Sequence, residues 1–205
     1  GDGTCATTVP GLYAAGDAAT RQLVCGGFTG GGSHNAAWAM SSGFWAGAGA
    51  ADYAHQSRRA VSQRRLHSSG GVALKENGAA EFDPRRLTQA VQAEVLPYDI
   101  NYFRTGERLT AAVDRLDSLW LDVRNAGQSS TTNVVKAREA AAMLATSRWM
   151  YRSALARTES RGMHKREDYP AMDSEQRHYL VSAGLDDVEV SVREAAWRPL
   201  QEIAA

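Results

Sequence analysis

A short apolar run that ends in Gly16-Asp17 and leads into a glycine-rich segment constrains the fold of this chain more than any other feature. Pro10-Gly11 is turn chemistry, and the apolar run Leu12–Ala15 behind it predicts a short buried strand. Gly16 lets the backbone bend where that strand ends, so the Asp17 carboxylate is presented there. Such a carboxylate accepts two hydrogen bonds while staying only partly desolvated, which suits neighbouring hydroxyl groups of a sugar-like ligand.

The glycine-rich segment Gly26–Asn35 opens a helix. Its glycines permit close approach of the backbone, and Ser33 is a good helix N-cap. Free amides at the helix start favour an anionic or electron-rich ligand. Small residues recur at helical spacing as far as about Tyr53, which predicts a helix from Ser33 that packs closely on a sheet or a cofactor.

Residues 55–83 are polar and predict a linker, either without regular structure or with one short helix. Two basic pairs, Arg58-Arg59 and Arg64-Arg65, lie within it. They have two interpretations, a phosphate-binding patch and a solvated stretch of linker. The second is favoured because charge runs between domains are usually solvated.

Helical patterns dominate from Asp83 onward. Asp83 is an N-cap candidate and Pro84 suits the first helical position, which predicts a helix over 85–96. Apolar spacing predicts further helices over 106–123 and 132–158, and the short connections favour a three-helix bundle. The runs 177–182 and 188–192 flank Gly184–Asp187 and predict a β-hairpin.

Composition is that of a folded chain without a strong electrostatic field. Its 205 residues carry 23 basic and 23 acidic side chains, so no global charge points to nucleic acid. Cys5 and Cys25 lack metal-ligand spacing and are expected to be reduced thiols. With no membrane-spanning apolar run and no signal-peptide pattern, we expect a cytoplasmic protein that contacts a membrane only through a partner.

Two stretches of the chain resemble one known family. Thr8–Asp17, followed by a loop and Gly30–Ser33, is similar to the end of the FAD domain in the succinate dehydrogenase and fumarate reductase flavoproteins, a family that includes L-aspartate oxidase and adenylylsulfate reductase. Far downstream, Arg157–Pro170 resembles the same family's Glu-Ser-Arg-Gly-x-His-x-Arg-x-Asp-Tyr/Phe-Pro signature. The two motifs stand in the family's order and span most of the chain.

The resemblance implies FAD as the cofactor and hydride transfer between a substrate and flavin N5 in the complete enzyme. Electrons would pass on to an iron–sulfur subunit, a quinone or oxygen. The family's N-terminal Gly-x-Gly-x-x-Gly does not occur here, so the chain looks like the C-terminal portion of a larger flavoprotein. Its partners would be the N-terminal FAD and capping domains, and we expect it to be inactive without them. The motif carries cofactor-binding roles to Gly16, Asp17, Gly32, Ser33, His34 and Asn35.

One departure concerns the substrate. Relatives that handle succinate or fumarate carry a His-Gly-x-x-Arg segment before the Gly-Gly-x-Ser turn, and a gapless count puts Val24 and Phe28 at its histidine and arginine positions. Neither side chain can bind a carboxylate or donate a proton, which argues against a C4-dicarboxylate substrate. Arg21 is the alternative partner if the loop carries an insertion.

Several charged and aromatic residues of the C-terminal half have both a structural and a functional interpretation. Arg161 or His164 is a substrate ligand on one interpretation. On the favoured interpretation, the charges of Arg157–Pro170 form a structural network that locks the segment after the third helix against the flavin domain. Arg148 and Arg152 on an apolar stripe indicate a contact with another domain or subunit, or else side chains that reach solvent. Three aromatic residues at helical spacing are expected to pack rather than bind a cofactor: Trp120, Trp149 and Tyr151.

The fold class expected is mainly α. A remnant strand and helix of an FAD-binding α/β domain (1–54) precede a linker (55–83) and a helical domain with a terminal hairpin (84–205). The alternative function is a non-catalytic helical interaction module derived from the same family.

Overall fold

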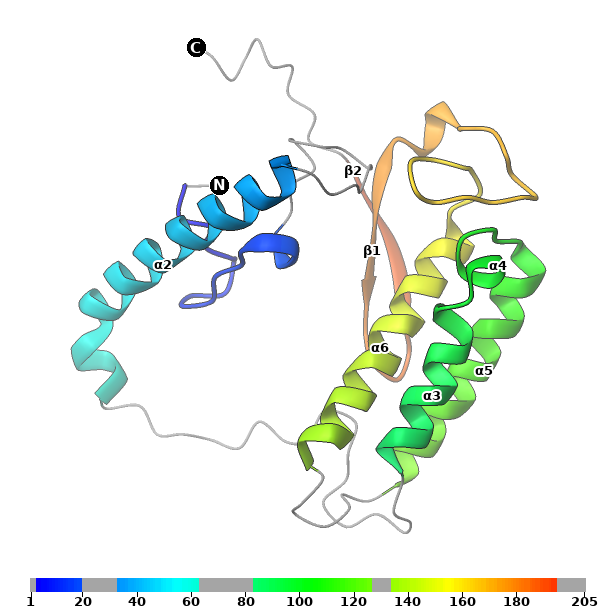
Figure 1. Cartoon of the computed structure of the whole chain (residues 1–205), viewed down its shortest axis with the longest axis horizontal. Helices are drawn as coiled ribbons and strands as arrows, with labels where there is room; N and C mark the ends of the chain where they lie inside the picture. Colours follow the sequence, from blue (N-terminus) through cyan, green and yellow to red (C-terminus); the bar gives the residue numbers. More distant parts are fainter. Residues whose placement is uncertain (1–2, 20–32, 63–82, 127–133, 195–205) are drawn as a thin grey trace. The chain divides into compact units, whose positions relative to one another are not determined.

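The computed structural model describes residues 3–19, 33–62, 83–126 and 134–194. These residues are mainly helical, with one two-stranded antiparallel sheet, as expected from the sequence (Figure 1). The chain divides into two compact units, residues 1–69 and 70–205, and each is described by itself.

The first unit is one long helix with a looped segment along it. Helix α2 spans Ser33–Ser62, and the one-turn 3-10 helix η1 spans Gly16–Ala18 (Figure 1). The Tyr13 hydroxyl donates to the Gly49 carbonyl of α2 at 2.9 Å. A Cβ on Gly49 would lie 2.8 Å from the Thr4 Cβ, so this close approach requires glycine.

The predicted strand Leu12–Ala15 is wrong. Within residues 3–19 the backbone makes only an isolated antiparallel bridge, between Ala6 and Tyr13. The Thr7 amide donates to Leu12 O and the Ala14 amide to Cys5 O, so the segment folds back on itself. A strand needs a ladder of neighbours, and this local loop supplies a single rung.

Helix α2 also continues past the predicted end near Tyr53 to Ser62, into the predicted linker. Residues 54–62 contain neither glycine nor proline, so nothing in them stops a helix. The remainder of the predicted linker, 63–82, and the Arg64-Arg65 pair lie outside the described residues.

The second unit contains the three predicted helices. They are α3 (Pro84–Val95), α5 (Gly106–Asn125) and α6 (Val134–Ala156), and the single turn α4 (Tyr98–Asn101) was not predicted. Asp83 accepts from the Arg85 amide at 2.8 Å, as expected for the N-cap. Thr105 caps α5 through the Arg108 amide at 3.2 Å. None of the described helices is long and apolar enough to span a membrane.

The core lies between these three helices (Figure 1). Both α3 and α5 pack on α6, whose inner face is mostly alanine and therefore admits close neighbours. Large side chains from α3 and α5 fill the space. The buried core comprises Leu87, Val91, Leu109, Ala112, Val113, Leu116, Trp120, Val123, Ala137, Ala140, Ala141, Leu144, Ala145, Tyr151 and Ala154.

The predicted hairpin is present and packs on α6. Strands β1 (His178–Ala183) and β2 (Glu189–Glu194) pair antiparallel. Gly184 begins the connection at φ +85°, a left-handed conformation that favours glycine. A 3-10 turn, η2 (Ser174–Gln176), precedes β1.

Candidate functional site

The Gly16-Asp17 turn is fixed on helix α2 through both backbone polar atoms of Gly16. The Gly16 amide donates to Ser42 Oγ, and Trp38 Nε1 donates to the Gly16 carbonyl, both at 2.9 Å. The buried Ser42 hydroxyl in turn donates to Trp38 O at 2.6 Å. Gly16 itself sits at φ +59°, so the bend expected from the sequence is real.

The proposed cofactor residues lie around this turn and at the start of α2. Asp17 is exposed in η1, His34 is exposed, and Asn35 is half-buried in the first turn of α2. Both Asp17 and Asn35 have interaction partners. Helix α2 begins at Ser33, as predicted, while Gly32 lies outside the described residues, as do Arg21, Val24, Cys25 and Phe28.

Trp38 and Ser42 are the functional candidates that sequence reasoning missed here. They hold the turn against the early part of the helix that His34 and Asn35 open. Their signal in the sequence is a polar and an indole side chain within an alanine- and glycine-rich helix. An exposed carboxylate at a rigid bend can accept hydrogen bonds from ligand hydroxyl groups, and a helix start favours electron-rich groups.

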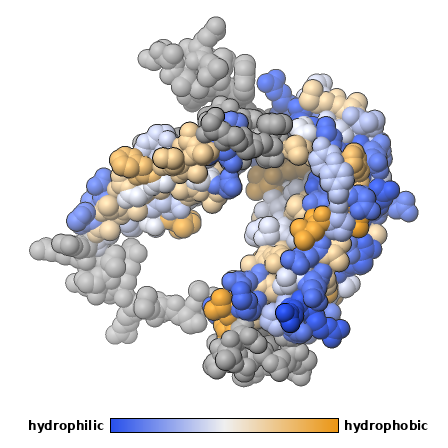
Figure 2. Space-filling model, viewed as in Figure 1, coloured by the Kyte–Doolittle hydropathy of each residue, from blue (hydrophilic) through white to orange (hydrophobic). Residues whose placement is uncertain are grey.

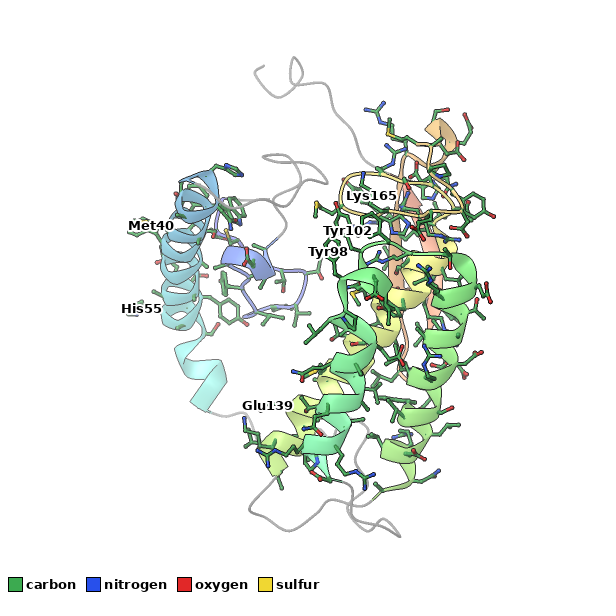
Figure 3. The ribbon with its side chains drawn as sticks, turned by 45° about the vertical axis from the view of Figure 1, so that its right-hand side comes forward. Met40, His55, Tyr98, Tyr102, Glu139 and Lys165 are labelled. Carbon is green, nitrogen blue, oxygen red and sulfur yellow. The ribbon has the colours of Figure 1, made fainter. Side chains whose placement is uncertain are left out.

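One face of α2 is apolar and is not covered by the other described residues of the first unit. Met40 and Phe44 are 77% and 75% exposed, and a Cβ on Gly43 or Gly47 would meet no atom within 4 Å. Figure 2 shows apolar side chains gathered on this helix, and Figure 3 shows Met40 pointing away from residues 3–19. We call Met40, Gly43, Phe44 and Gly47 the open face of α2.

Glu159 is the centre of a charge network after α6. It is 0% exposed and accepts from Arg157 at 2.8 Å, from Arg161 at 2.7 and 2.9 Å, and from the Asp173 amide at 2.8 Å. Burial by itself raises the pKa of Glu159, but the hydrogen bonds from Arg161, Asp173 and Arg157 outweigh it and lower the pKa to about 2. Arg161 therefore forms a structural ion pair with Glu159.

Arg166 joins the ends of two helices. Its buried guanidinium donates to the carbonyls of Ala154, Leu155 and Arg157, which close the C-terminal end of α6. It also pairs with Asp168, which accepts from the Gly106 amide at the start of α5 at 2.8 Å. The bond from Arg166 holds the pKa of Asp168 well below its usual range.

His164 is held as a neutral acceptor. Its Nδ1 lies 2.9 Å from Arg104 Nη1, and its Nε2 lies 3.3 Å from Arg157 O. Because a guanidinium only donates, Nδ1 accepts and the proton is on Nε2. Burial, followed by the charges of Arg104, Arg166 and Arg157, lowers the pKa of His164 to about 4. The charges of Arg157–Pro170 form a structural network within the helical unit, and their expected contact with the flavin domain stays a prediction. Sequence reasoning missed Arg104, whose partner lies 60 positions along the chain.

The expectations for Arg148 are wrong. Only 3% exposed, it neither reaches solvent nor faces another domain: it pairs with Asp117 at 2.6 Å and donates to the carbonyls of Leu185 and Asp186. Its guanidinium also lies 4.9 Å from the centre of the Trp120 ring. The side chain therefore anchors the hairpin turn on α5 and α6. Arg152, which is partly exposed, pairs with the same Asp117.

The three aromatic residues pack as predicted. The Trp120 indole donates to Asp186, the Trp149 indole to Gly184 O, and the Tyr151 hydroxyl to Glu94 O. Among residues 3–19, 33–62, 83–126 and 134–194, no three histidine, cysteine or acidic side chains are placed to hold a metal ion.

Comparison with known proteins relates the chain to one group of flavoproteins. Residues 89–202 match the family described as fumarate reductase flavoprotein C-term. The fumarate reductase flavoprotein subunits of Mycobacterium tuberculosis strains H37Rv and CDC 1551 are each 33% identical over 193 residues, which is 86% of this chain and 32% of theirs. The chain thus spans about a third of the length of these curated relatives.

Solved structures with a similar fold include the Mycobacterium smegmatis Sdh1 complex. In its apo form the match has a TM-score of 0.68 at 25% identity and covers 94% of this chain and 36% of that one. In complex with UQ1 the match has a TM-score of 0.65 at 26% identity and covers 98% of this chain and 37% of that one. A variant of Escherichia coli quinol fumarate reductase FrdA matches with a TM-score of 0.71 at 20% identity, over 96% of this chain and 36% of that one, and shows the shared fold.

Proposed function

Because this chain belongs to the fumarate reductase flavoprotein family, we propose that it is the C-terminal part of an FAD-dependent oxidoreductase of the succinate dehydrogenase and fumarate reductase type. The rest of the flavoprotein supplies the N-terminal FAD and capping domains, and an iron–sulfur subunit is a further partner. Contact with a membrane, where it occurs, is made through such a partner.

The observation that carries the proposal is the Gly16 turn, locked on α2 by Trp38 and Ser42. Both polar backbone atoms of Gly16 are bonded inside the chain, so the turn is preorganised before any ligand arrives. Such rigidity is more than a solvent-facing loop needs. It supports a role for Gly16 and Asp17 in positioning a cofactor.

The residues proposed to hold FAD are Gly16, Asp17, Gly32, Ser33, His34 and Asn35. Bound FAD supplies the hydride chemistry of the complete enzyme. Asp17 accepts hydrogen bonds from hydroxyl groups, and the amides at the start of α2 stabilise negative charge beside them.

The open face of α2 supports the proposal that more protein packs on this unit. A wholly apolar face built from methionine, phenylalanine and glycine resembles a domain core cut in half. The remainder of the flavin domain is its proposed occupant. The helical unit would hold that assembly in place and provide no catalytic side chain. Its candidates Arg161, His164 and Arg166 are each bonded to another side chain of the charge network.

Purification of the chain alone and together with the rest of its flavoprotein tests the proposal. We expect the joined preparation to carry a flavin band near about 450 nm and the chain alone to be colourless. The band should bleach when the right substrate is added. Since a gapless count puts Val24 and Phe28 at the family's histidine and arginine positions, the screen compares succinate and fumarate with other carbonyl and acid substrates. A colourless joined preparation that takes up no added FAD would favour the interaction module instead.

A further inference from the structure

Three aromatic rings form an exposed cluster at the turn between α3 and α5. Tyr98 and Tyr102 stack with their ring centres 4.9 Å apart, and Phe103 meets both edge-on at 5.3 and 5.0 Å. Tyr98 is 66% exposed. We call these three residues the aromatic surface; they line a shallow hollow of about 430 Å³ together with Lys165 and other residues of the loop after α6 (Figure 3).

The backbone under the aromatic surface is held rigidly. Asn101 Nδ2 donates to Val95 O at 2.8 Å. The Arg104 guanidinium donates to the backbone carbonyl of Asn101 at 2.5 Å and to Asn101 Oδ1 at 2.7 Å. The Arg104 amide donates to Lys165 O, and the Glu167 amide donates to Arg104 O. The rings and the backbone of Lys165 are therefore held relative to each other before anything binds.

Among the charged residues that line the hollow, one cation has no acidic partner. Arg166 is neutralised by Asp168, and Glu167 pairs with Arg108 at 3.2 Å. Lys165 is half-buried, and its ammonium makes no ion pair or hydrogen bond with the residues that the structure describes. An acidic partner for Lys165 is therefore missing among the described residues.

The chemistry of the surface fits a separable protein partner. Small-molecule sites enclose most of their ligand, whereas this hollow is shallow and open. Tyrosine and phenylalanine are enriched at protein–protein interfaces relative to the rest of the surface. By contrast, the open face of α2 carries no polar side chain, which is typical of a permanent interface.

We propose that the aromatic surface and Lys165 dock a segment of a separate partner subunit, one that presents a carboxylate next to an apolar side chain. The carboxylate pairs with Lys165, and the apolar side chain packs on the outer face of Tyr98. This proposal rests on the proposed function only for the existence of a second subunit.

Site-specific photo-crosslinking in the source cells tests it. Tyr98 is replaced by p-benzoyl-phenylalanine in the full natural polypeptide, and the crosslinked peptide is identified by mass spectrometry. We expect one separate polypeptide, crosslinked within a segment that contains an aspartate or glutamate. The same probe at Leu121, an exposed position on α5, is the matched control and should not capture that segment.

Charge variants separate docking from chance proximity. Lys165→Glu should lower the crosslink yield by about tenfold or more, while Lys165→Arg keeps it within about twofold. Circular dichroism and flavin content, measured on the same preparations, show whether each variant is folded and loaded. A folded, flavin-bearing protein that crosslinks only within its own polypeptide, to a second copy of itself, to a segment without acidic residues, or to nothing would overturn this inference and leave the proposed function standing.

Discussion

Arg166 and Asp168 form a two-point ion pair in which the Nε–Oδ1 and Nη2–Oδ2 distances are both 2.8 Å. The pair ties the last carbonyls of α6 to the first amide of α5. Both helix ends therefore depend on two side chains separated by a single residue.

Removal of the Arg166 guanidinium should destabilise the helical unit strongly. Arg166→Met leaves Asp168 and three carbonyls without their donor, so we expect a loss of about 3–5 kcal/mol in the free energy of unfolding. Lys136→Met is the control, because its ion pair with Glu139 is exposed and contributes at most about 1 kcal/mol. Urea unfolding measures both. Equal losses would mean that the pair does not hold the helix ends.

Stability should fall as the pH drops below neutrality because of His164. Its pKa is about 4 in the folded chain and 6.5 as the reference for the unfolded chain, so the unfolded state binds more protons between these values. This stabilisation is complete above pH 6.5 and is lost as the pH falls towards 4. Urea unfolding from pH 7 to 4 should show the slope, and His164→Gln should flatten it. His55→Gln, at an exposed position, is the control for the substitution itself.

Glu159 should cause a second loss of folding stability in acid, at lower pH than that caused by His164. Its pKa of about 2 lies below the ordinary 4.5, so its stabilisation is present above pH 4.5 and is lost as the pH falls towards 2. Glu159→Gln should destabilise the chain by about 3 kcal/mol or more at neutral pH, because Arg157 and Arg161 lose a buried partner. Thermal unfolding at pH 7 and pH 3 checks this. A variant as stable as wild type at pH 7 would contradict the network.

Arg148 should hold the hairpin in place. Arg148→Lys keeps the charge but cannot reach Asp117 and two carbonyls at once, so the amides of β1 and β2 should exchange with solvent at least about tenfold faster. Hydrogen exchange followed by mass spectrometry measures this. The exposed Arg124→Lys serves as control, since Arg124 also pairs with the hairpin residue Asp186. Unchanged protection in Arg148→Lys would show that the hairpin is anchored otherwise.

Two glycines of α2 should respond oppositely to alanine. A Cβ on Gly49 would lie 2.8 Å from Thr4 Cβ and 2.9 Å from Tyr13 Cε1, so Gly49→Ala should push residues 3–14 off the helix. Gly43→Ala meets nothing in this chain and should stabilise α2 by up to about 1 kcal/mol. Proteolysis of the N-terminal segment separates the two variants. Equal cleavage rates would contradict the packing described for Gly49.

Local signals in the sequence predicted local structure well. Asp83-Pro84 predicted the start of α3, and Gly184–Asp187 predicted the hairpin turn, because cap and turn chemistry acts within a few residues. The end of α2 was placed too early because no stop signal marks it.

Features that depend on distant partners were harder to predict. Leu12–Ala15 has strand composition but no neighbouring ladder within the described residues, and Arg148 is buried by Asp117 and by carbonyls of the hairpin. At the candidate site the motif predicted the bend at Gly16 but not the anchors Trp38 and Ser42. Their role appears only when the turn lies on the helix.

The flavin content of the complete flavoprotein tests the central claim most directly when two glycine variants are compared. Gly16 and Gly162 have nearly equal left-handed φ values, +59° and +57°, so alanine introduces a similar backbone strain of about 1–2 kcal/mol at each. We predict that Gly16→Ala lowers the FAD bound per polypeptide several-fold, while Gly162→Ala retains the wild-type content. Equal FAD content in both variants and wild type would contradict the assignment of the Gly16-Asp17 turn to the cofactor.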